Sequence, residues 1–355
     1  MSHLPARREA PGAVSWLPRS DSADTTVSAR VLARISASMP DSTRRAYAGD
    51  WGRFEDWCLR AGRRALPATA ETLAEYASHL ADQKKKPATI TRALSSVRVI
   101  HQYAGEPAAD SQAARAVVRA YRGERAQAGL PNSSPAAALS AEHLQQMSGA
   151  LGANEVLHLR DQVLLVLGWA TNRRRHVLAA LNITDVAAVD NGLDITVRRD
   201  KTDQQATGKV VAAPYGSNPL TCPVRLTLAW ITLLADRGIT SGALLRAVDR
   251  HGVIAGQPGK AWAGRPPAAG GRMSPDSINR AVQRAGVRAG LPSGVLQALS
   301  AHSLRAGGAT AAYLGGADLL SIARHGGWAD GSSALYRYIR DVDRWTKNPM
   351  YRAGL

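Results

Sequence analysis

The stretch AHSLRAGGATAAYLGGADLLSIARHGGWADGSSALYRYIR, residues 301–340, decides the fold of the second half of the chain. His302 and Arg305 lie three positions apart, about one helical turn, so both side chains face the same point. A Gly-Gly pair separates two apolar helical segments, and the stretch closes on Trp328 and then Tyr338. A cation, an imidazole and a phenol gathered in this way suit attack of the phenol on a phosphodiester.

The composition points to a polyanionic partner. Of 355 residues, 45 are Lys or Arg and 28 are Asp or Glu, which gives a formal net charge of +17. Nucleic acid is the commonest partner of so basic a chain. The alternative is a solvated basic surface with no partner, because charge alone defines no site.

Cysteine usage and hydropathy indicate a cytoplasmic protein. Cys58 and Cys222 form no C-x-x-C pattern, so neither a zinc site nor a disulfide scaffold is expected, and a reducing compartment fits. The N-terminal residues MSHLPARREAPG lack the apolar core of a signal peptide. No apolar run approaches the roughly 18 residues that cross a bilayer, so we expect no membrane partner.

The pattern along the chain predicts two domains. Residues 1–38 show little periodicity and are expected to form a flexible arm. Four amphipathic helices with short loops are expected within 39–125, which indicates a small helical bundle. A Gly/Pro/Ser/Ala-rich linker follows at 126–139, and residues 140–355 form the second domain.

Apolar spacing supports both assignments. In the first helix Tyr47, Trp51, Phe54 and Cys58 recur at spacings of four, three and four, which is one helical face. The second domain reads as helices around a small sheet, a mainly α fold of the α+β class. The expected elements are helices at about 157–171 and 173–181, strands through 193–197 and 209–213, a helix from Pro223, and a basic helix at 274–290 with Ile278, Val282 and Val287 buried.

The C-terminal motifs resemble those of the tyrosine recombinases, or phage integrases. HSLR matches the family's H-x-x-R, GGW matches its G-H or G-W, and the ending RYIR is Cre-like. The resemblance implies an N-terminal helical DNA-binding bundle and a C-terminal tyrosine-recombinase catalytic domain. It implies site-specific strand exchange through a 3′-phosphotyrosyl intermediate, with no cofactor, metal, ATP or small-molecule substrate. The implied partner is double-stranded DNA with a specific target site, bound by a homotetramer on paired sites.

The resemblance also implies a catalytic set. Its members are Arg174, Lys201, His302, Arg305, Trp328 and Tyr338. Two guanidiniums would hold the phosphate, because each is planar, always charged and bidentate. Alignment on the L-x-x-L that follows places the first arginine at Arg174, although three arginines in a row could also simply touch the DNA backbone. Val177 occupies a position that is acidic in the family, so the surroundings of this arginine must be built differently here.

Each remaining candidate has an alternative. Lys201 would be the general acid for the leaving 5′ oxygen, or else an exposed lysine that contacts phosphate. His302 would act as acid, base or hydrogen-bond donor, although a lone histidine is often structural. Trp328 would donate its indole N–H to phosphate, or else be a core aromatic.

The nucleophile is assigned between two tyrosines. Tyr338 lies 338 − 328 = 10 positions after Trp328, one more than the family's usual nine, which leaves Tyr336 as a rival. We favour Tyr338 because Y-I-R matches the Cre-like ending. Residues two apart on a helix point to different faces, so only one can serve.

A further basic set is expected to contact DNA. Its members lie at the start of the first bundle helix, before and on the third helix, beside the first catalytic arginine, and on the basic helix at 274–290. Backbone N–H groups also point outward at the start of the third helix, which favours phosphate contacts there. Its members are Arg44, Arg45, Lys84, Lys85, Lys86, Arg92, Arg173, Arg175 and Arg280.

Two other functions remain open at this point. A type IB topoisomerase-like enzyme uses similar groups but swivels one strand and rejoins it; the helical N-terminal block argues against it. A DNA-binding protein of the same fold with impaired catalysis would explain both Val177 and the long spacing before Tyr338.

Overall fold

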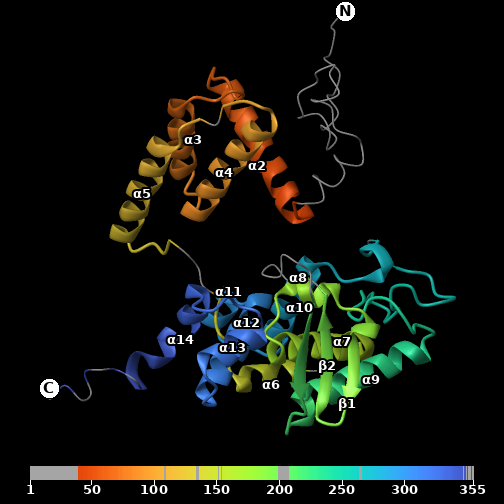
Figure 1. Ribbon diagram of the computed structural model, residues 1–355. Helices are drawn as coiled ribbons and strands as arrows, with labels where there is room; N and C mark the ends of the chain where they lie inside the picture. Colours follow the sequence, from red (N-terminus) through yellow and green to blue (C-terminus); the bar gives the residue numbers. More distant parts are fainter. Residues whose placement is uncertain are drawn as a thin grey trace, which may run out of the picture. The chain divides into compact units, whose positions relative to one another are not determined.

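The computed structural model describes residues 39–350 and residue 353, without 108, 133–135, 151, 153, 199–207, 264–265, 347 and 349. The chain divides into two compact units, residues 1–134 and 135–355, labelled by element in Figure 1. The division falls inside the segment expected to be a linker. The arm expected at 1–38 lies outside the described residues.

The first unit is a bundle of helices around one core. Its helices are α2 (Asp41–Arg60), α3 (Ala70–Asp82), α4 (Pro87–Tyr103) and α5 (Gln112–Gln127). The apolar face predicted for α2 is the packed one, with Phe54 and Cys58 fully buried. His101 on α4 joins the core by accepting a 2.7 Å hydrogen bond from the backbone N–H of Ala68. This histidine is therefore a structural residue.

The second unit is helical with one small sheet. Its helices are α6 (Ala141–Gly149), α7 (Glu155–Ala170), α8 (Arg175–Ala180), α9 (Pro223–Asp236), α10 (Pro275–Arg288), α11 (Ser293–Ala298), α12 (Ala301–Leu314), α13 (Leu319–Gly326) and α14 (Ser333–Thr346). Its 3₁₀ turns are η1 (Ile183–Asp185), η2 (Pro219–Thr221) and η3 (Ala269–Gly271). The predicted class, mainly helical with a small β-sheet, is confirmed.

The sheet holds three antiparallel strands in the order β1-β2-β3. These are β1 (Val186–Val189), β2 (Gly192–Val197) and β3 (Lys209–Pro214). Val197 pairs with Lys209, so β2 and β3 form the predicted hairpin, whose connecting segment carries Lys201. β1 was not predicted, because its exposed residues show no apolar alternation.

Helix α7 is the centre of the second core. Val163 to Leu167 are all buried, so this helix has no solvent face there, and α9 and α12 pack against it. On α10 the predicted buried residues Ile278 and Val282 are fully buried. The expectation for Val287 was wrong, because it is 65% exposed and belongs to the helix's outer face. No helix among the described residues is long and apolar enough to cross a membrane.

The Gly- and Pro-rich segment 238–272 is organised by one arginine. Arg246 is buried and donates to the carbonyls of Ser241 and Ala255 at 2.8 Å each, and to Ala243 and Gly270 at 3.2 and 3.1 Å. Because these bonds satisfy loop carbonyls that a helix or sheet would otherwise pair, the described part of the segment keeps a fixed path with no α-helix or strand, and η3 is its one 3₁₀ turn.

Candidate active site

The site begins at the N-terminus of α12. Ser300 caps this helix, and its hydroxyl accepts the backbone N–H of His302 at 3.2 Å. The cap fixes the first turn, so the His302 side chain stands at the helix end, where it stays accessible to solvent although neighbouring groups surround part of the imidazole. Arg305 follows one turn later and is only 1% exposed. The predicted pairing of these two residues on one helix is therefore present.

Arg305 is fixed by three neighbours. Its Nη1 donates to the carbonyl of Gly326 at 2.6 Å and also to the carbonyl of Asn172. Its guanidinium carbon lies 3.5 Å from the ring centroid of Trp328. The stacking places a cation directly on the indole face, the geometry of a strong cation–π contact. Trp328 is thus both a buried aromatic and the platform that orients Arg305.

The side chain of Tyr338 on α14 points toward His302 and Trp328. Its hydroxyl is hydrogen-bonded to Nε2 of His302, and its ring lies 6.3 Å from that of Trp328 at 67°. Tyr336 is 45% exposed, as expected for a residue two positions away on a helix. The structure therefore brings Tyr338, and not Tyr336, to the histidine.

The electrostatics of this pair follow from burial and three arginines. Desolvation lowers the pKa of His302, and the positive charges of Arg305, Arg174 and Arg337 lower it further. Desolvation raises the pKa of Tyr338, and the same three arginines act against that rise. Near neutral pH both groups are uncharged, so the phenol O–H donates to a neutral imidazole nitrogen.

Arg174 and Arg337 complete the positive surroundings. Arg174 is half-buried at the N-cap of α8, close enough for its charge to act on both His302 and Tyr338. Arg337 was missed from the sequence, although its place beside the nucleophile in RYIR was a usable signal. Lys201 lies outside the described residues.

Val177 shows how the site differs behind Arg174. It is 2% exposed and packs with Val197 at the end of β2 and Val211 on β3. The position at which the family resemblance implies an acidic residue is therefore part of an apolar cluster here. This three-valine cluster joins α8 to the hairpin that carries Lys201.

The two arginines beside Arg174 have other partners. Arg173 is 3% exposed and donates to the carbonyl of His325 at 2.6 Å, so it ties the end of α7 to α13. Arg173 therefore has a structural contact inside the protein, and its expected contact with DNA stays a prediction. Arg175 is exposed and forms a 3.1 Å ion pair with Asp276.

Two glycines allow the close packing around the site. A side chain at Gly308 of α12 would meet the carbonyl of Trp169 and the amide of Asn172. A side chain at Gly326 would meet the ring of Trp328. Glycine is therefore required at Gly308, where α12 meets the end of α7, and at Gly326, where α13 meets Trp328.

Most of the other basic candidates are on the surface. Lys84, Lys85 and Lys86 are exposed in the turn before α4, and Arg45 and Arg280 are exposed on α2 and α10. Arg44 is half-buried on α2. Arg92 is partly exposed but engaged by Asp50. Whether any of them contacts DNA stays a prediction.

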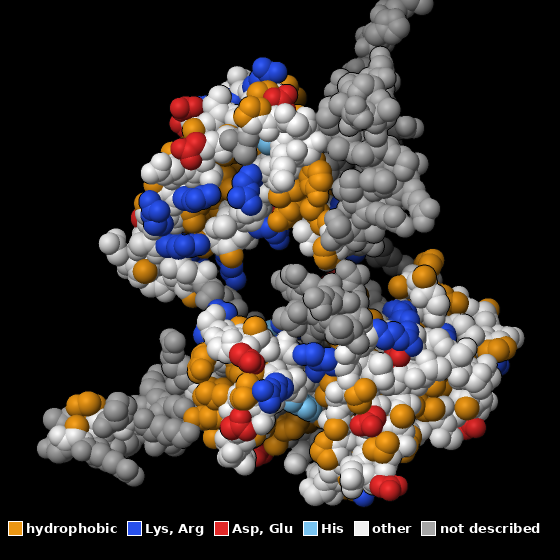
Figure 2. Space-filling model, in the orientation of Figure 1, with side chains coloured by type: hydrophobic (Ala, Val, Ile, Leu, Met, Phe, Trp, Pro, Cys, Tyr) orange, Lys and Arg blue, Asp and Glu red, His pale blue; other side chains and the backbone are white. Residues whose placement is uncertain are grey.

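A basic stripe on α5 was missed from the sequence. Arg115, Arg119 and Arg122 are exposed at spacings of four and three, which is one helical face. Figure 2 shows Lys and Arg side chains gathered over this helix. The signal was the arginine spacing, which the apolar residues of the same helix obscured.

Sequence comparison identifies relatives of both units. The family described as "Phage integrase, N-terminal SAM-like domain" matches residues 32–106. An "Integrase/recombinase xerD homolog" of Selenomonas ruminantium is 28% identical over 333 residues, which cover 92% of this chain and 89% of the relative.

Solved structures share the fold. XerH site-specific recombinase, in a post-cleavage complex with a palindromic difH substrate, matches with a TM-score of 0.56 and 14% identity over 90% of this chain and 83% of that one. A lambda integrase dimer bound to a COC′ core site matches with a TM-score of 0.52 and 16% identity over 87% of this chain and 92% of that one. The arrangement of helices and sheet is therefore shared.

Proposed function

Because the chain belongs to the tyrosine recombinase and integrase family, we propose that it is a site-specific DNA recombinase whose nucleophile is Tyr338 and whose base is His302. The observation that carries the residue assignment is the hydrogen bond between the Tyr338 hydroxyl and Nε2 of His302. It supports an active enzyme over a DNA-binding protein without catalysis, because a nucleophile and its base are already within reach of each other.

The first step is a transesterification. The Tyr338 oxygen attacks phosphorus and forms an O–P bond, while its proton moves to Nε2 of His302. The bond from phosphorus to the 5′ oxygen breaks, and that oxygen takes a proton to leave as a hydroxyl. The reverse step with a 5′ hydroxyl of another strand restores the phosphodiester, so the bond energy is kept in the phosphotyrosyl link and no ATP enters the balance.

The protonation states allow this direction of proton transfer, although the lowered pKa of His302 and the raised pKa of Tyr338 both weaken its driving force. The pKa of His302 is lowered by burial and by three arginines, so the imidazole is free to accept a proton at neutral pH. Positioned acid–base groups of this kind typically contribute about 10²- to 10⁴-fold in rate. The same arginines act against the raised pKa of Tyr338 and so favour its anionic form as the proton leaves.

The phosphate is held by the cations of the site. Arg305 and Arg174 would hold its non-bridging oxygens, where charge grows in the five-coordinate transition state. Trp328 keeps Arg305 flat against the indole face and so fixes its direction. Lys201 is proposed as the acid that protonates the leaving 5′ oxygen, from the family resemblance alone.

The partner is DNA, and the assembly is proposed to be a homotetramer on paired sites, as the family resemblance implies. Sedimentation of the chain with a duplex that carries its site would test this. Complexes with no more than two protein copies on paired duplexes would contradict it.

The function is tested by covalent capture. The full chain is mixed with nicked duplexes that carry sequences it selects from a randomised pool, and protein–DNA adducts are resolved on a denaturing gel. We expect an adduct that Tyr338→Phe abolishes and Tyr336→Phe retains. A chain that selects a sequence but forms no adduct would be a binding protein only. Relaxation of a supercoiled plasmid without the selected site would favour the topoisomerase-like alternative.

A further inference from the structure

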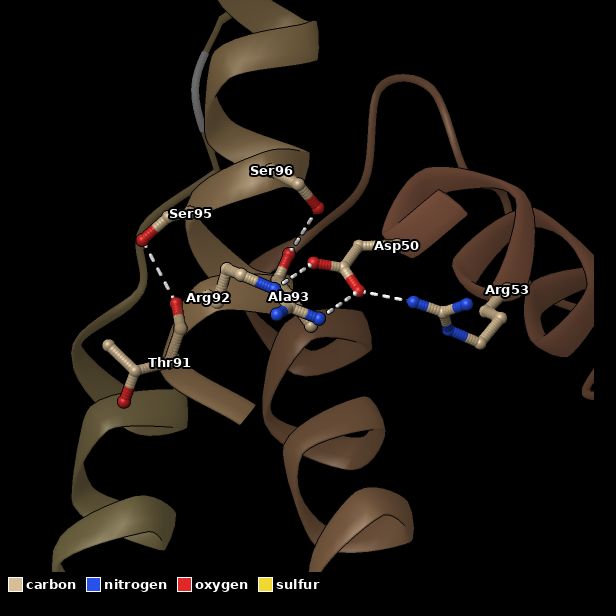
Figure 3. A network of polar contacts seen from close by, with 7 residues as sticks. All are labelled: Asp50, Arg53, Thr91, Arg92, Ala93, Ser95 and Ser96. Carbon is tan, nitrogen blue, oxygen red and sulfur yellow. Dashed lines mark hydrogen bonds and ion pairs between the residues drawn. The ribbon is translucent and has the colours of Figure 1, made fainter. Parts of the chain in front are cut away.

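A buried carboxylate on the first unit joins two exposed arginines. Asp50 on α2 is 2% exposed and accepts from Nε of Arg92 at 2.7 Å and from Nη2 of Arg92 at 3.1 Å. Arg53, one turn along α2, donates to the same carboxylate. Figure 3 shows the two guanidiniums meeting at Asp50, one from α2 and one from α4. These three residues are called the Asp50 clamp below.

Stability alone is a weak reason for the Asp50 clamp. Withdrawing a carboxylate from water is costly, and an apolar residue between two helices is often at least as stabilising as a buried ion pair. Helices α2 and α4 pack against each other, and Phe54 of α2 and Ile90 of α4 are both fully buried in the core of this unit. The side chains of Arg53 and Arg92 are 62% and 48% exposed, so the cations face outward while the anion is inside. What the clamp does supply is a fixed direction for the guanidinium of Arg92.

The bound edge of Arg92 leaves a second edge open. Arginine carries five N–H donors in one plane, and Asp50 takes the edge formed by Nε and Nη2. In the part of the chain that the structure describes, Asp50 is the one hydrogen-bond partner of this guanidinium. The opposite edge, formed by Nη1 and the second Nη2 hydrogen, is therefore directed away from the carboxylate. It offers two parallel donors to a ligand with two acceptors in one plane.

The side chains next to Arg92 on α4 are small and do not protrude from the helix. Thr91 and Ser95 are its neighbours on α4, and their hydroxyls fold back to donate to helix carbonyls at 2.9 Å each. Ala88 is exposed one turn earlier. A helix with small side chains on one face can lie deep in the major groove of DNA, which admits an α-helix. The exposed lysines before α4 are then placed for the flanking phosphates.

We propose that Arg92 contacts the N7 and O6 edge of a guanine in the major groove, and that Asp50 is the positioning residue that holds the guanidinium in the plane of that base. This inference rests on the proposed function, because its ligand is double-stranded DNA. A phosphate accepts hydrogen bonds from many directions, whereas a guanine edge accepts the two donors of an arginine in one plane. A carboxylate that fixes this plane therefore favours a base contact over a phosphate contact as the form of the DNA contact expected for Arg92.

The test measures sequence preference position by position. The full chain with Tyr338→Phe, which prevents strand cleavage, selects duplexes from a pool with a randomised central segment. Asp50→Asn and Arg92→Lys are compared with Asp56→Asn, an exposed charge change on the same helix. We expect one guanine position with a preference of about 5- to 150-fold. Asp50→Asn and Arg92→Lys should flatten that position alone, and Asp56→Asn should leave it intact.

Other results would overturn the proposal. Affinity that falls evenly across all sequences, with a salt slope shallower by about one, would make Arg92 a phosphate contact. An unchanged preference in both variants would make the Asp50 clamp purely structural. Arg92→Lys covers the case in which Asp50→Asn fails to fold, because Asp50 keeps Arg53. Covalent capture of DNA by the unaltered chain is measured in parallel and separates this inference from the proposed function. If capture occurs but the guanine preference is the same in the variants, only the inference is contradicted. If neither capture nor a guanine preference is found, both the inference and the proposed function are contradicted.

Discussion

Replacing Val177 by the acidic residue that the family resemblance implies at this position should destabilise this protein. Val177 is 2% exposed between Val197 and Val211, which are 3% exposed each, and burial of such a side chain contributes about 1.5–3 kcal/mol. Val177→Glu loses part of that term and places a carboxylate among apolar groups. A rise of two to three units in the pKa of the new Glu costs about 3–4 kcal/mol more. We therefore expect a total loss of about 4–6 kcal/mol in the free energy of unfolding at pH 7.5.

The pH dependence isolates the charge. A Glu whose pKa is higher in the folded than in the unfolded state destabilises the fold above its folded pKa. That penalty shrinks as the pH falls through the folded pKa and vanishes below the unfolded value of about 4.3. Urea unfolding of Val177→Glu and its neutral control Val177→Gln should differ at pH 7.5, approach each other as the pH falls, and converge near pH 4. If Val177→Glu is as stable as the unaltered chain at pH 7.5, or cleaves faster, the apolar interpretation of this position is wrong.

Three further changes probe the site. Gly326→Ala places a methyl group against the ring of Trp328, so urea unfolding should show a loss of about 1–3 kcal/mol, and an unchanged midpoint would contradict the packing. Arg337→Gln removes one cation that lowers the pKa of His302, so the pKa of His302 should rise. Because adduct formation needs the neutral imidazole, its rate should begin to fall at a higher pH than in the unaltered chain when the pH is lowered. An unmoved pH profile would exclude His302 as the base. Arg173→Met loses a charge-assisted bond inside the protein and should cost about 1.5–3 kcal/mol in urea unfolding, whereas a loss only in DNA affinity would return this arginine to the DNA surface.

Local patterns predicted most of the elements. The 3.6-residue spacing of Phe54 and Cys58 and the alternation at Leu193 and Ile195 identified helix α2 and strand β2 correctly. Strand β1 and helix α11 were not found, because β1 is largely exposed and α11 buries none of its residues. Periodicity reports burial on one face, so short elements without a buried face leave no signal.

The arrangement within the site depends on contacts that no local pattern contains. His302 and Tyr338 are 36 positions apart and Asp50 and Arg92 are 42 apart, and neither pairing follows from spacing on one helix. In the run of three arginines, composition could not separate the buried Arg173 from the half-buried Arg174 and the exposed Arg175. Family resemblance supplied the catalytic candidates, whereas burial and hydrogen bonds assign their surroundings.

The assignment of Tyr338 as the nucleophile is tested most directly by identifying the tyrosine that becomes linked to DNA. Trypsin cuts after Arg324, Arg337 and Arg340, so Tyr336 and Tyr338 fall into different peptides of a digested adduct. After nuclease trimming, mass spectrometry should find the residual nucleotide on the peptide of residues 338–340. A nucleotide on the peptide of residues 325–337 would contradict the assignment of Tyr338 as the nucleophile and the role of its hydrogen bond to His302.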